Sequence, residues 1–242
     1  MKLPVKISPC PLVETIAEIR FEPAVPAQAV FGLVYKPLQE SFPQTVALPQ
    51  SALPETLFEQ NPAVKYQPHY RLDSEDFSLM IGPWSVAVGT RGEYPGWATV
   101  FPTIAETLNE ALATGVAKRV ERFGLRFINF FDGDVFPKLH LSFAFRGAPL
   151  KGSETFFKTV LDLAEVKAVL QVGKDLALQT PFRKIGIGSL IDIDCFVPDP
   201  PHRDFLDTEV SQFLQVAHQR EKETFFSLLK DEFLQQFNPK YE

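Results

Sequence analysis

The feature that most limits how this chain can fold is alternation of apolar and polar residues in short segments that follow one another closely. Residues 11–21, PLVETIAEIRF, set Glu14, Glu18 and Arg20 on the strand face opposite the apolar one. The apolar face carries Val13, Thr15, Ala17, Ile19 and Phe21. Residues 69–92 contain three further short strands, with turn-forming residues at 73–76 and 82–83. The pattern predicts an antiparallel meander near the start of the chain.

Further strand segments follow in the second half. RVERFGLRFINFF, residues 119–131, is rich in Phe, Val and Ile, and residues 139–147 have a similar composition. Residues 181–200 predict one or two strands closed by prolines. Residues 150–180 are ambiguous, because they are compatible with a helical beginning and an extended end with a turn at 173–175.

Three segments have helical periodicity. Residues 26–36 predict a helix that ends before Pro37, because the residue before proline is disfavoured in the helical region. Residues 98–114 predict an amphipathic helix that stops at Gly115. From Asp204 onward, apolar residues recur at helical spacing and predict one long helix, either continuous or broken near Arg220.

Strands in short meanders, separated by helices and followed by a long helix, are typical of an antiparallel α+β fold rather than a parallel α/β fold. We therefore expect one α+β domain spanning residues 1–242, with the proline-rich stretch 4–68 as an elaborated edge. Each half also ends in strands followed by a helix. This order suggests two related halves, about 1–132 and 133–242, although any two such units look alike at this level.

Composition excludes several classes of protein. Apolar residues are 45% and charged residues 22% of the chain, as in ordinary globular domains. The 23 phenylalanines suit a thick core between a sheet and its helices, and an aromatic ligand cage is the alternative. A net charge of -6 disfavours general nucleic-acid binding, which needs a basic face.

Cysteine usage and the first residues bear on location. Cys10 and Cys195 are the only cysteines, so neither a disulfide framework nor a cysteine zinc site is expected. The opening MKLPVKISPCPLVE has no continuous apolar core, and no apolar run in the chain has the length of a membrane span. We expect a cytoplasmic protein with no membrane association.

Motifs that carry specific chemistry are missing. Gly186-Ile187-Gly188 is a lone GxG inside a strand, so we interpret it as a twisted or bulged strand rather than a nucleotide fingerprint. The histidines occur singly, without the paired spacing of metal ligands, and are expected to be structural: His69, His140, His202 and His218. There is no phosphate loop or nucleophile elbow. We assign no catalytic residue, metal or cofactor.

Charged residues at alternate strand positions are the best site candidates. Asp192 and Asp194 share one strand face, where paired carboxylates can hold a divalent cation or divide acid and base roles. They can equally oppose arginines on a solvated sheet face. The residues concerned are Arg122, Arg126, Asp192, Asp194, Glu18 and Arg20. In the functional version, Arg122 and Arg126 receive the carboxylate or phosphate of an anionic small molecule.

Five segments together carry a resemblance: PLVETIAEIRF, YPGW, RFGLRFINFF, SLIDIDCF and AHQREKETFFSLLKDEFLQQF. The chain resembles, over nearly its whole length, a sporadically distributed family of roughly 260-residue bacterial and archaeal proteins without an assigned function. The best-matching run contains Arg122, Gly124, Leu125, Arg126, Phe127, Ile128 and Asn129. Phe123 stands where the family usually has an aliphatic residue. The resemblance implies a single domain, prokaryotic origin and a role beside mobile or defence genes, and it transfers no catalytic residue.

These observations favour a cytoplasmic, non-enzymatic binding or interaction protein whose partner is another protein or a second copy of the chain. The alternative is a small-molecule-binding or hydrolytic protein with a polar cleft that contains Arg122, Arg126, Asp192 and Asp194. The two differ in whether the arginine-bearing sheet face is open and concave or covered and paired.

Overall fold

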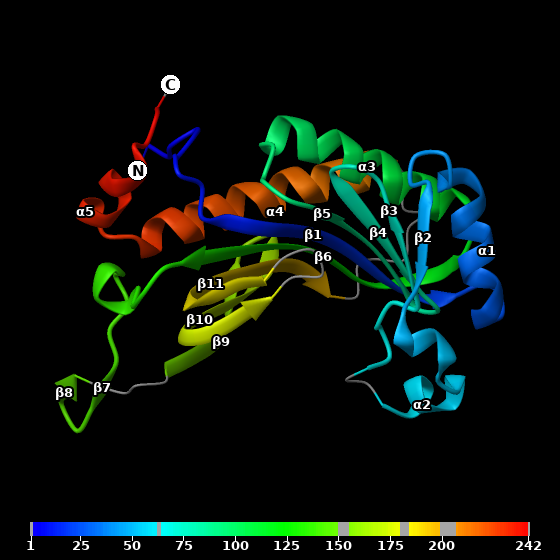
Figure 1. The fold of residues 1–242 in the computed structure, drawn as a ribbon, viewed down its shortest axis with the longest axis horizontal. Coiled ribbons are helices and arrows are strands. Elements are labelled where there is room, and N and C mark those ends of the chain that lie inside the picture. Colours follow the sequence, from blue (N-terminus) through cyan, green and yellow to red (C-terminus); the bar gives the residue numbers. More distant parts are fainter. Residues whose placement is uncertain (1, 62–63, 150–154, 180–183, 199–206, 242) are drawn as a thin grey trace. The chain divides into compact units, whose positions relative to one another are not determined.

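The computed structural model describes residues 2–61, 64–149, 155–179, 184–198 and 207–241 (Figure 1). The strands are β1 Leu12–Pro23, β2 Gln44–Ala47, β3 Tyr70–Asp73, β4 Phe77–Gly82, β5 Ser85–Thr90, β6 Ala117–Phe131, β7 Ala144–Phe145, β8 Ala148–Pro149, β9 Thr155–Leu163, β10 Val166–Gln179 and β11 Lys184–Pro198. The helices are α1 Ala27–Leu38, α2 Glu55–Gln60, α3 Trp97–Ala113, α4 Asp207–Leu228 and α5 Asp231–Leu234, with 3-10 turns η1 Pro49–Ala52, η2 Phe136–Lys138 and η3 Gln235–Phe237.

Nine of the strands form one open antiparallel sheet, in the order β2-β3-β4-β5-β1-β6-β11-β10-β9. Packed helices and a long helix near the carboxyl end complete an α+β fold, as the sequence predicts. The remaining strands, β7 and β8, pair only with each other. The expected meander is present, because β3, β4 and β5 pair in sequence order.

The chain divides into two compact units. The central unit contains Thr15–Leu125 and Phe196–Gln215, and the terminal unit contains Met1–Glu14, Arg126–Cys195 and Val216–Glu242. Each unit therefore gathers segments that are far apart in the sequence. The expectation of two related halves, 1–132 and 133–242, stays a prediction.

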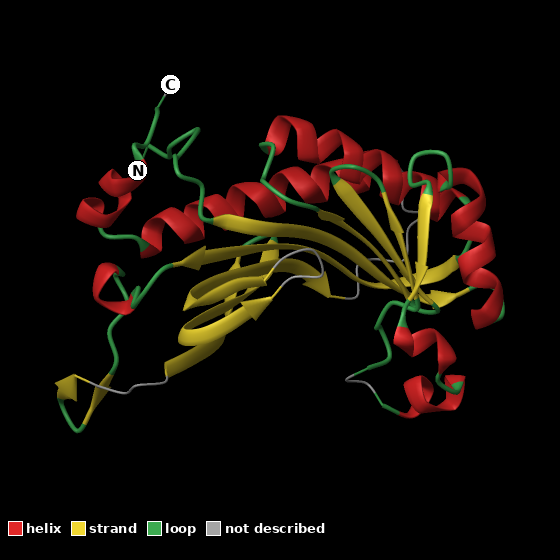
Figure 2. Cartoon of the chain, viewed as in Figure 1, coloured by secondary structure: helices red, strands yellow, loops and turns green. Residues whose placement is uncertain are grey.

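In the central unit, α1 and α3 lie beside each other and contact the meander strands, α1 at β4 and α3 at β5 (Figures 1 and 2). The alternation in β1 works as predicted, because Thr15, Ala17, Ile19 and Phe21 are buried while their neighbours are partly exposed. Helix α3 begins at Trp97 and ends just before Gly115, whose φ is 73°. The fully buried side chains here include Val30, Val34, Leu79, Val88, Ile104, Leu108, Phe123 and Leu125.

In the terminal unit, β9 and β10 form a hairpin whose closing pair is Leu163 and Val166. The two ends of the chain meet here, because Lys6 and Lys240 form an isolated antiparallel bridge. Phenylalanine rings pair with one another here, with the buried Phe131 beside Phe233 at 5.5 Å and the half-buried Phe143 beside Phe157 at 5.1 Å between ring centroids. These ring contacts are those of packed side chains, in keeping with the first of the two interpretations of the phenylalanine count.

The first helix extends further than predicted. It continues through Pro37 to Leu38, whereas the sequence indicates an end before the proline. Val30, Val34 and Leu38 recur at four-residue spacing on the buried face, and burial of Leu38 keeps the last turn helical. The missing proline amide costs little near a helix end, where hydrogen bonding is already incomplete.

Residues 139–147 are not the predicted strand. Leu139 makes only an isolated bridge to Leu229, and regular pairing begins at Ala144. A strand needs a neighbouring strand to pair with along its length, and residues 139–143 have none in the described part of the chain. A strand-like composition therefore does not by itself produce a strand here. The ambiguous region 150–180 is extended where it is described, as β9 and β10, and its turn falls at Ala164 and Glu165 instead of 173–175.

The long terminal helix is not broken near Arg220. It runs without interruption to Leu228, and the break before α5 falls at residues 229–230. Charged residues around Arg220 interrupt the apolar periodicity of the sequence there, but their side chains also form hydrogen bonds between neighbouring turns of the helix. Arg220 donates to Glu223 at 2.8 Å, a spacing that supports rather than ends a helix.

Among the described residues, no helix combines the length and apolar character that crossing a membrane requires.

Candidate functional site

The predicted charged face of the terminal unit centres on Arg126 of β6 and Asp192 of β11, which are neighbouring strands. Arg126 donates from Nε and Nη2 to the two carboxylate oxygens of Asp192, at 2.8 and 2.6 Å. Gln171 of β10 donates to the same carboxylate at 2.6 Å. Asp192 is 1% exposed, so this bidentate pair is largely withdrawn from water on its acidic side.

Two further carboxylates lie near this pair. The hydrogen bonds that Arg126 donates to Asp192 raise the pKa of Arg126, and the charges of Asp194 and Glu14 add to that effect. Burial raises the pKa of Glu14, while the positive charge of Arg126 acts in the opposite direction. The arginine therefore already has several negative groups around it.

In the central unit, Glu18 of β1 collects the other two predicted arginines. Its Oε2 accepts from Arg20 Nε at 2.7 Å and from Arg122 Nη1 at 3.1 Å. Each guanidinium also lies over an aromatic ring, with Arg20 4.6 Å from the Tyr66 centroid and Arg122 4.8 Å from that of Phe196. This arrangement fixes the arginines in place on the strand face.

The six predicted site residues thus fall into two groups, Arg126 with Asp192 and Asp194 in the terminal unit, and Arg122 with Glu18 and Arg20 in the central unit. Both arginine groups contact carboxylates of the chain itself. An external carboxylate or phosphate would have to compete with Asp192 for Arg126. The anion-binding interpretation of these residues stays a prediction.

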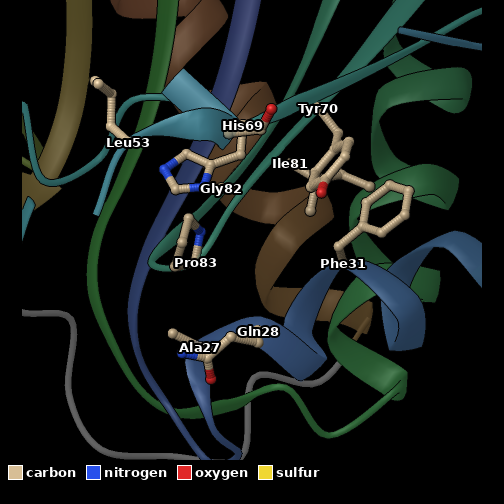
Figure 3. Close-up of a pocket in the computed structure, with 10 residues that line it drawn as sticks. Ala27, Gln28, Phe31, Leu53, His69, Tyr70, Ile81, Gly82 and Pro83 are labelled. Carbon is tan, nitrogen blue, oxygen red and sulfur yellow. The ribbon is translucent and has the colours of Figure 1, made fainter. Parts of the chain in front are cut away.

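A pocket of about 300 Å³ lies in the central unit, at the ends of β3 and β4. Figure 3 shows its labelled walls, with Phe31 and Tyr70 on one side, His69 and Pro83 on another, and Ala27 and Gln28 at the start of α1. Ser51, Leu53, Ile81 and Gly82 complete the lining. Its wall offers apolar and polar surface in comparable shares, and its volume is at the lower end of the range of small-ligand sites.

Backbone hydrogen bonds hold His69 at the pocket. Its amide donates to the Ile81 carbonyl at 2.9 Å, and its carbonyl accepts from the Leu48 amide at 2.9 Å. Beside it, Gly82 packs closely on backbone, because a Cβ there would lie 2.7 Å from the Gln67 carbonyl oxygen. The backbone of His69 is therefore held in place at a closely packed strand end, and this fixes where the imidazole begins.

The imidazole of His69 is incompletely satisfied. Its Nε2 is shielded from solvent and has no hydrogen-bond partner in the described part of the chain, although the ring packs on Phe58 with 4.6 Å between centroids. Gln50 Oε1, in the same 3-10 turn as Ser51, is also shielded from solvent and has no hydrogen-bond partner among the described residues. Burial lowers the pKa of His69, so the ring is neutral at neutral pH and can offer one donor and one acceptor.

The opposite wall is aromatic. The rings of Phe31 and Tyr70 stack with 3.9 Å between centroids and an interplanar angle of 26°, and Tyr35 extends the stack behind Phe31 at 5.4 Å. A planar ligand would find a flat apolar surface on this side and hydrogen-bonding groups on the other.

Sequence reasoning missed this pocket. His69 was expected to be structural, and the proline-rich region that supplies Ser51 and Leu53 was interpreted only as an elaborated edge. The lining residues come from four separate segments with no common spacing. Two adjacent aromatic-type residues, His69 and Tyr70, at the start of a strand were the only local signal.

The other expected structural residues are placed as follows. His218 is in α4, and burial lowers its pKa to about 3, whereas His140 is exposed. His202 lies outside the described residues. Gly186, with φ of 134°, lies in β11, in keeping with the twisted-strand interpretation. Within the described ranges, no three His, Cys, Asp or Glu side chains are placed to hold a metal ion.

No protein-family model and no curated protein matches this chain. The resemblance to the sporadic prokaryotic family therefore stays a prediction.

Proposed function

We propose that this protein works by binding rather than catalysis, and that the pocket beside His69 holds a small planar molecule with a hydrogen-bonding edge. The observation that carries the proposal is a pocket of about 300 Å³ whose wall places the imidazole of His69 across from the stacked rings of Phe31 and Tyr70.

The chemistry of the walls defines the ligand class. Stacking on the Phe31–Tyr70 pair favours a flat aromatic or heteroaromatic ring. A neutral imidazole favours a neutral edge with a donor or an acceptor over a strongly charged group. Nucleobases and similar heterocycles satisfy both conditions and have the size of such a pocket.

A cytoplasmic location and a role beside mobile or defence genes belong to the same proposal. The first is supported by two free cysteines, Cys10 and Cys195, which a reducing compartment would maintain. The second rests on the family resemblance alone.

The test is calorimetric titration of the whole chain with adenine, uracil, indole and benzoate, together with two pocket variants, Tyr70→Ala and His69→Phe. We expect saturable binding of at least one heterocycle, at least tenfold weaker in both variants. Loss of the stacking surface accounts for the first variant, and loss of the hydrogen-bonding edge accounts for the second.

Two matched controls come from the terminal unit. Tyr241→Ala removes an exposed tyrosine and His140→Phe an exposed histidine, and both should bind as the wild type does. If no probe binds, or if binding survives in Tyr70→Ala and His69→Phe, the pocket is not the ligand site.

A further inference from the structure

The two edges of the nine-stranded sheet differ in how they are protected. At one edge, β2 has four residues, all exposed. At the other, β9 has nine residues without a proline, and no strand of the described residues pairs with its outer side. Proteins usually shorten or interrupt an edge strand, because its free backbone groups can pair with another chain. The β9 edge lacks that protection.

One face of β9 exposes apolar surface. Phe156 is 55% exposed and Val160 is 54% exposed, and both share the strand face that carries Lys158 and Asp162. The Phe156 side chain lies across Gly173 of β10, where a Cβ would come within 3.0 Å of its ring. An aromatic and an aliphatic side chain thus remain in water at a sheet edge, which marks an interaction surface more than a solvated one.

The hairpin geometry indicates which backbone groups are free. Leu163 and Val166 flank the two-residue loop, and residues in that position form a hydrogen-bonded pair. Because alternate residues of a strand direct their amides and carbonyls to opposite sides, Lys158, Val160 and Asp162 direct theirs away from β10. These are the groups that another strand would bond.

The charged residues on this face of β9 can pair with those of a second copy of the chain. If two copies of β9 pair antiparallel around a two-fold axis at Val160, Lys158 of each copy lies opposite Asp162 of the other. Lys158 has no ion pair within the described part of the chain, and Asp162 pairs only loosely with Lys167, at 3.4 Å, with both side chains exposed. Shifting the axis by one residue, to Thr159 or Leu161, removes this match.

We propose that the chain forms a symmetric homodimer through antiparallel pairing of its β9 edges about Val160. The two open sheets then become continuous across the interface, and the exposed Val160 side chains lie against each other. On the opposite face, Phe157 lies across from Leu163 of the second copy, which adds an apolar pair on that side. Two Lys158–Asp162 pairs set the register.

The experiment is sedimentation velocity of the full chain over a dilution series, with charge-reversal variants. The wild type should sediment as a dimer of the 27.3 kDa chain that dissociates on dilution. Lys158→Glu places four acidic groups at the interface and Asp162→Lys four basic ones, so each should weaken the dimer at least tenfold. The double variant K158E/D162K restores opposite charges and should restore dimerisation. Lys36→Glu, on the exposed face of α1, makes the same charge change elsewhere and should leave the dimer intact.

Hydrogen exchange on the wild type gives a second measurement that does not depend on any variant folding. The amides of Lys158, Val160 and Asp162 should exchange slowly at high protein concentration and quickly on dilution. A wild type that stays monomeric, single variants that dimerise normally, a double variant that folds but stays monomeric, or amides insensitive to dilution would each overturn the proposal. A monomer that takes another protein at this edge counts among these contrary results.

Discussion

Arg126 and Asp192 are joined by two parallel hydrogen bonds, at 2.8 and 2.6 Å, on a carboxylate that is 1% exposed. The pair connects two neighbouring strands of the terminal unit, β6 and β11, and Gln171 of β10 adds a third strand to it. The buried carboxylate of Asp192 therefore connects three strands of the sheet. The same residues that the sequence marks for ligand binding contribute to holding the sheet together.

Replacing Asp192 with Asn should lower the free energy of unfolding by roughly 2–3 kcal/mol, because Arg126 and Gln171 then lose a charged acceptor. Urea denaturation followed by circular dichroism measures the change. Glu22→Gln is the matched control, since Glu22 pairs with Lys118 at 2.6 Å on the exposed surface and its loss should leave the midpoint unchanged. Equal effects of the two variants would show that the Asp192 pair contributes no more than a surface pair.

Periodicity predicted the parts of the fold in which one strand face is buried and the other is wet. In β1, Ile19 and Phe21 alternate with Glu18 and Arg20, and that contrast is visible in the sequence. Periodicity fails as a predictor where burial depends on residues that are far away in the sequence. Leu38 extends α1 past Pro37 because it enters the core, and residues 155–179 pair as a hairpin although their apolar spacing also fits a helix.

The candidate site illustrates the same limit. Alternation placed Arg126 and Asp192 on polar strand faces, and they do meet, but alternation says nothing of whether a ligand or another side chain completes the contact. The pocket beside His69 was invisible because its walls come from α1, η1, β3 and β4. Only the folded chain brings Phe31 to Tyr70, which are 39 residues apart in the sequence.

Gly188 of β11 should be far less tolerant of substitution than Gly32 of α1. A Cβ at Gly188 would clash with the Phe131 carbonyl oxygen and the Phe130 ring, so Gly188→Ala should destabilise the protein by roughly 1–3 kcal/mol. Gly32 has nothing within 4 Å, and Gly32→Ala should stabilise the exposed helix by about 0.5–1 kcal/mol. Thermal unfolding of the two variants should move the midpoint in opposite directions. Two shifts of the same sign would contradict the placement of Gly188 against β6.

The two cysteines should differ in reactivity. Cys195 is fully buried, and burial raises the pKa of its thiol, whereas Cys10 is exposed although its thiol pKa is also raised by burial. Ellman's reagent should therefore label one thiol slowly in the native protein and two in guanidinium chloride. Cys10→Ser should abolish the native reaction. Native labelling that survives this substitution would mean that Cys195 is accessible.

His218 should make the protein less stable as the pH falls below 6.5. Burial lowers its pKa from 6.5 to about 3, so between these values the unfolded chain binds a proton that the folded chain does not. The free energy of unfolding therefore decreases from this group as the pH falls through that window. His218→Gln should flatten the acid side of the stability profile, measured by urea denaturation at several pH values. An unchanged slope between pH 4 and 6 would indicate that the imidazole titrates freely.

Glu221 should have the opposite effect at higher pH. It is 6% exposed on α4, and burial raises its pKa from 4.5 to about 8, with the charge of Lys222 opposing the shift. Between these values the folded chain holds a proton that the unfolded chain has lost, so the free energy of unfolding falls as the pH rises, by at most about 1.4 kcal/mol per pH unit. From pH 4.5 to 6.5 this slope offsets that of His218. Above pH 6.5 the Glu221 contribution acts without that opposition, and the loss of stability is complete above pH 8.

Glu221→Gln removes the ionisable group while keeping its shape. The variant should therefore match the wild type in stability near pH 4.5 and become progressively more stable than the wild type as the pH approaches 8. A constant difference across that range would mean that the Glu221 carboxyl ionises as readily in the folded chain as in the unfolded one.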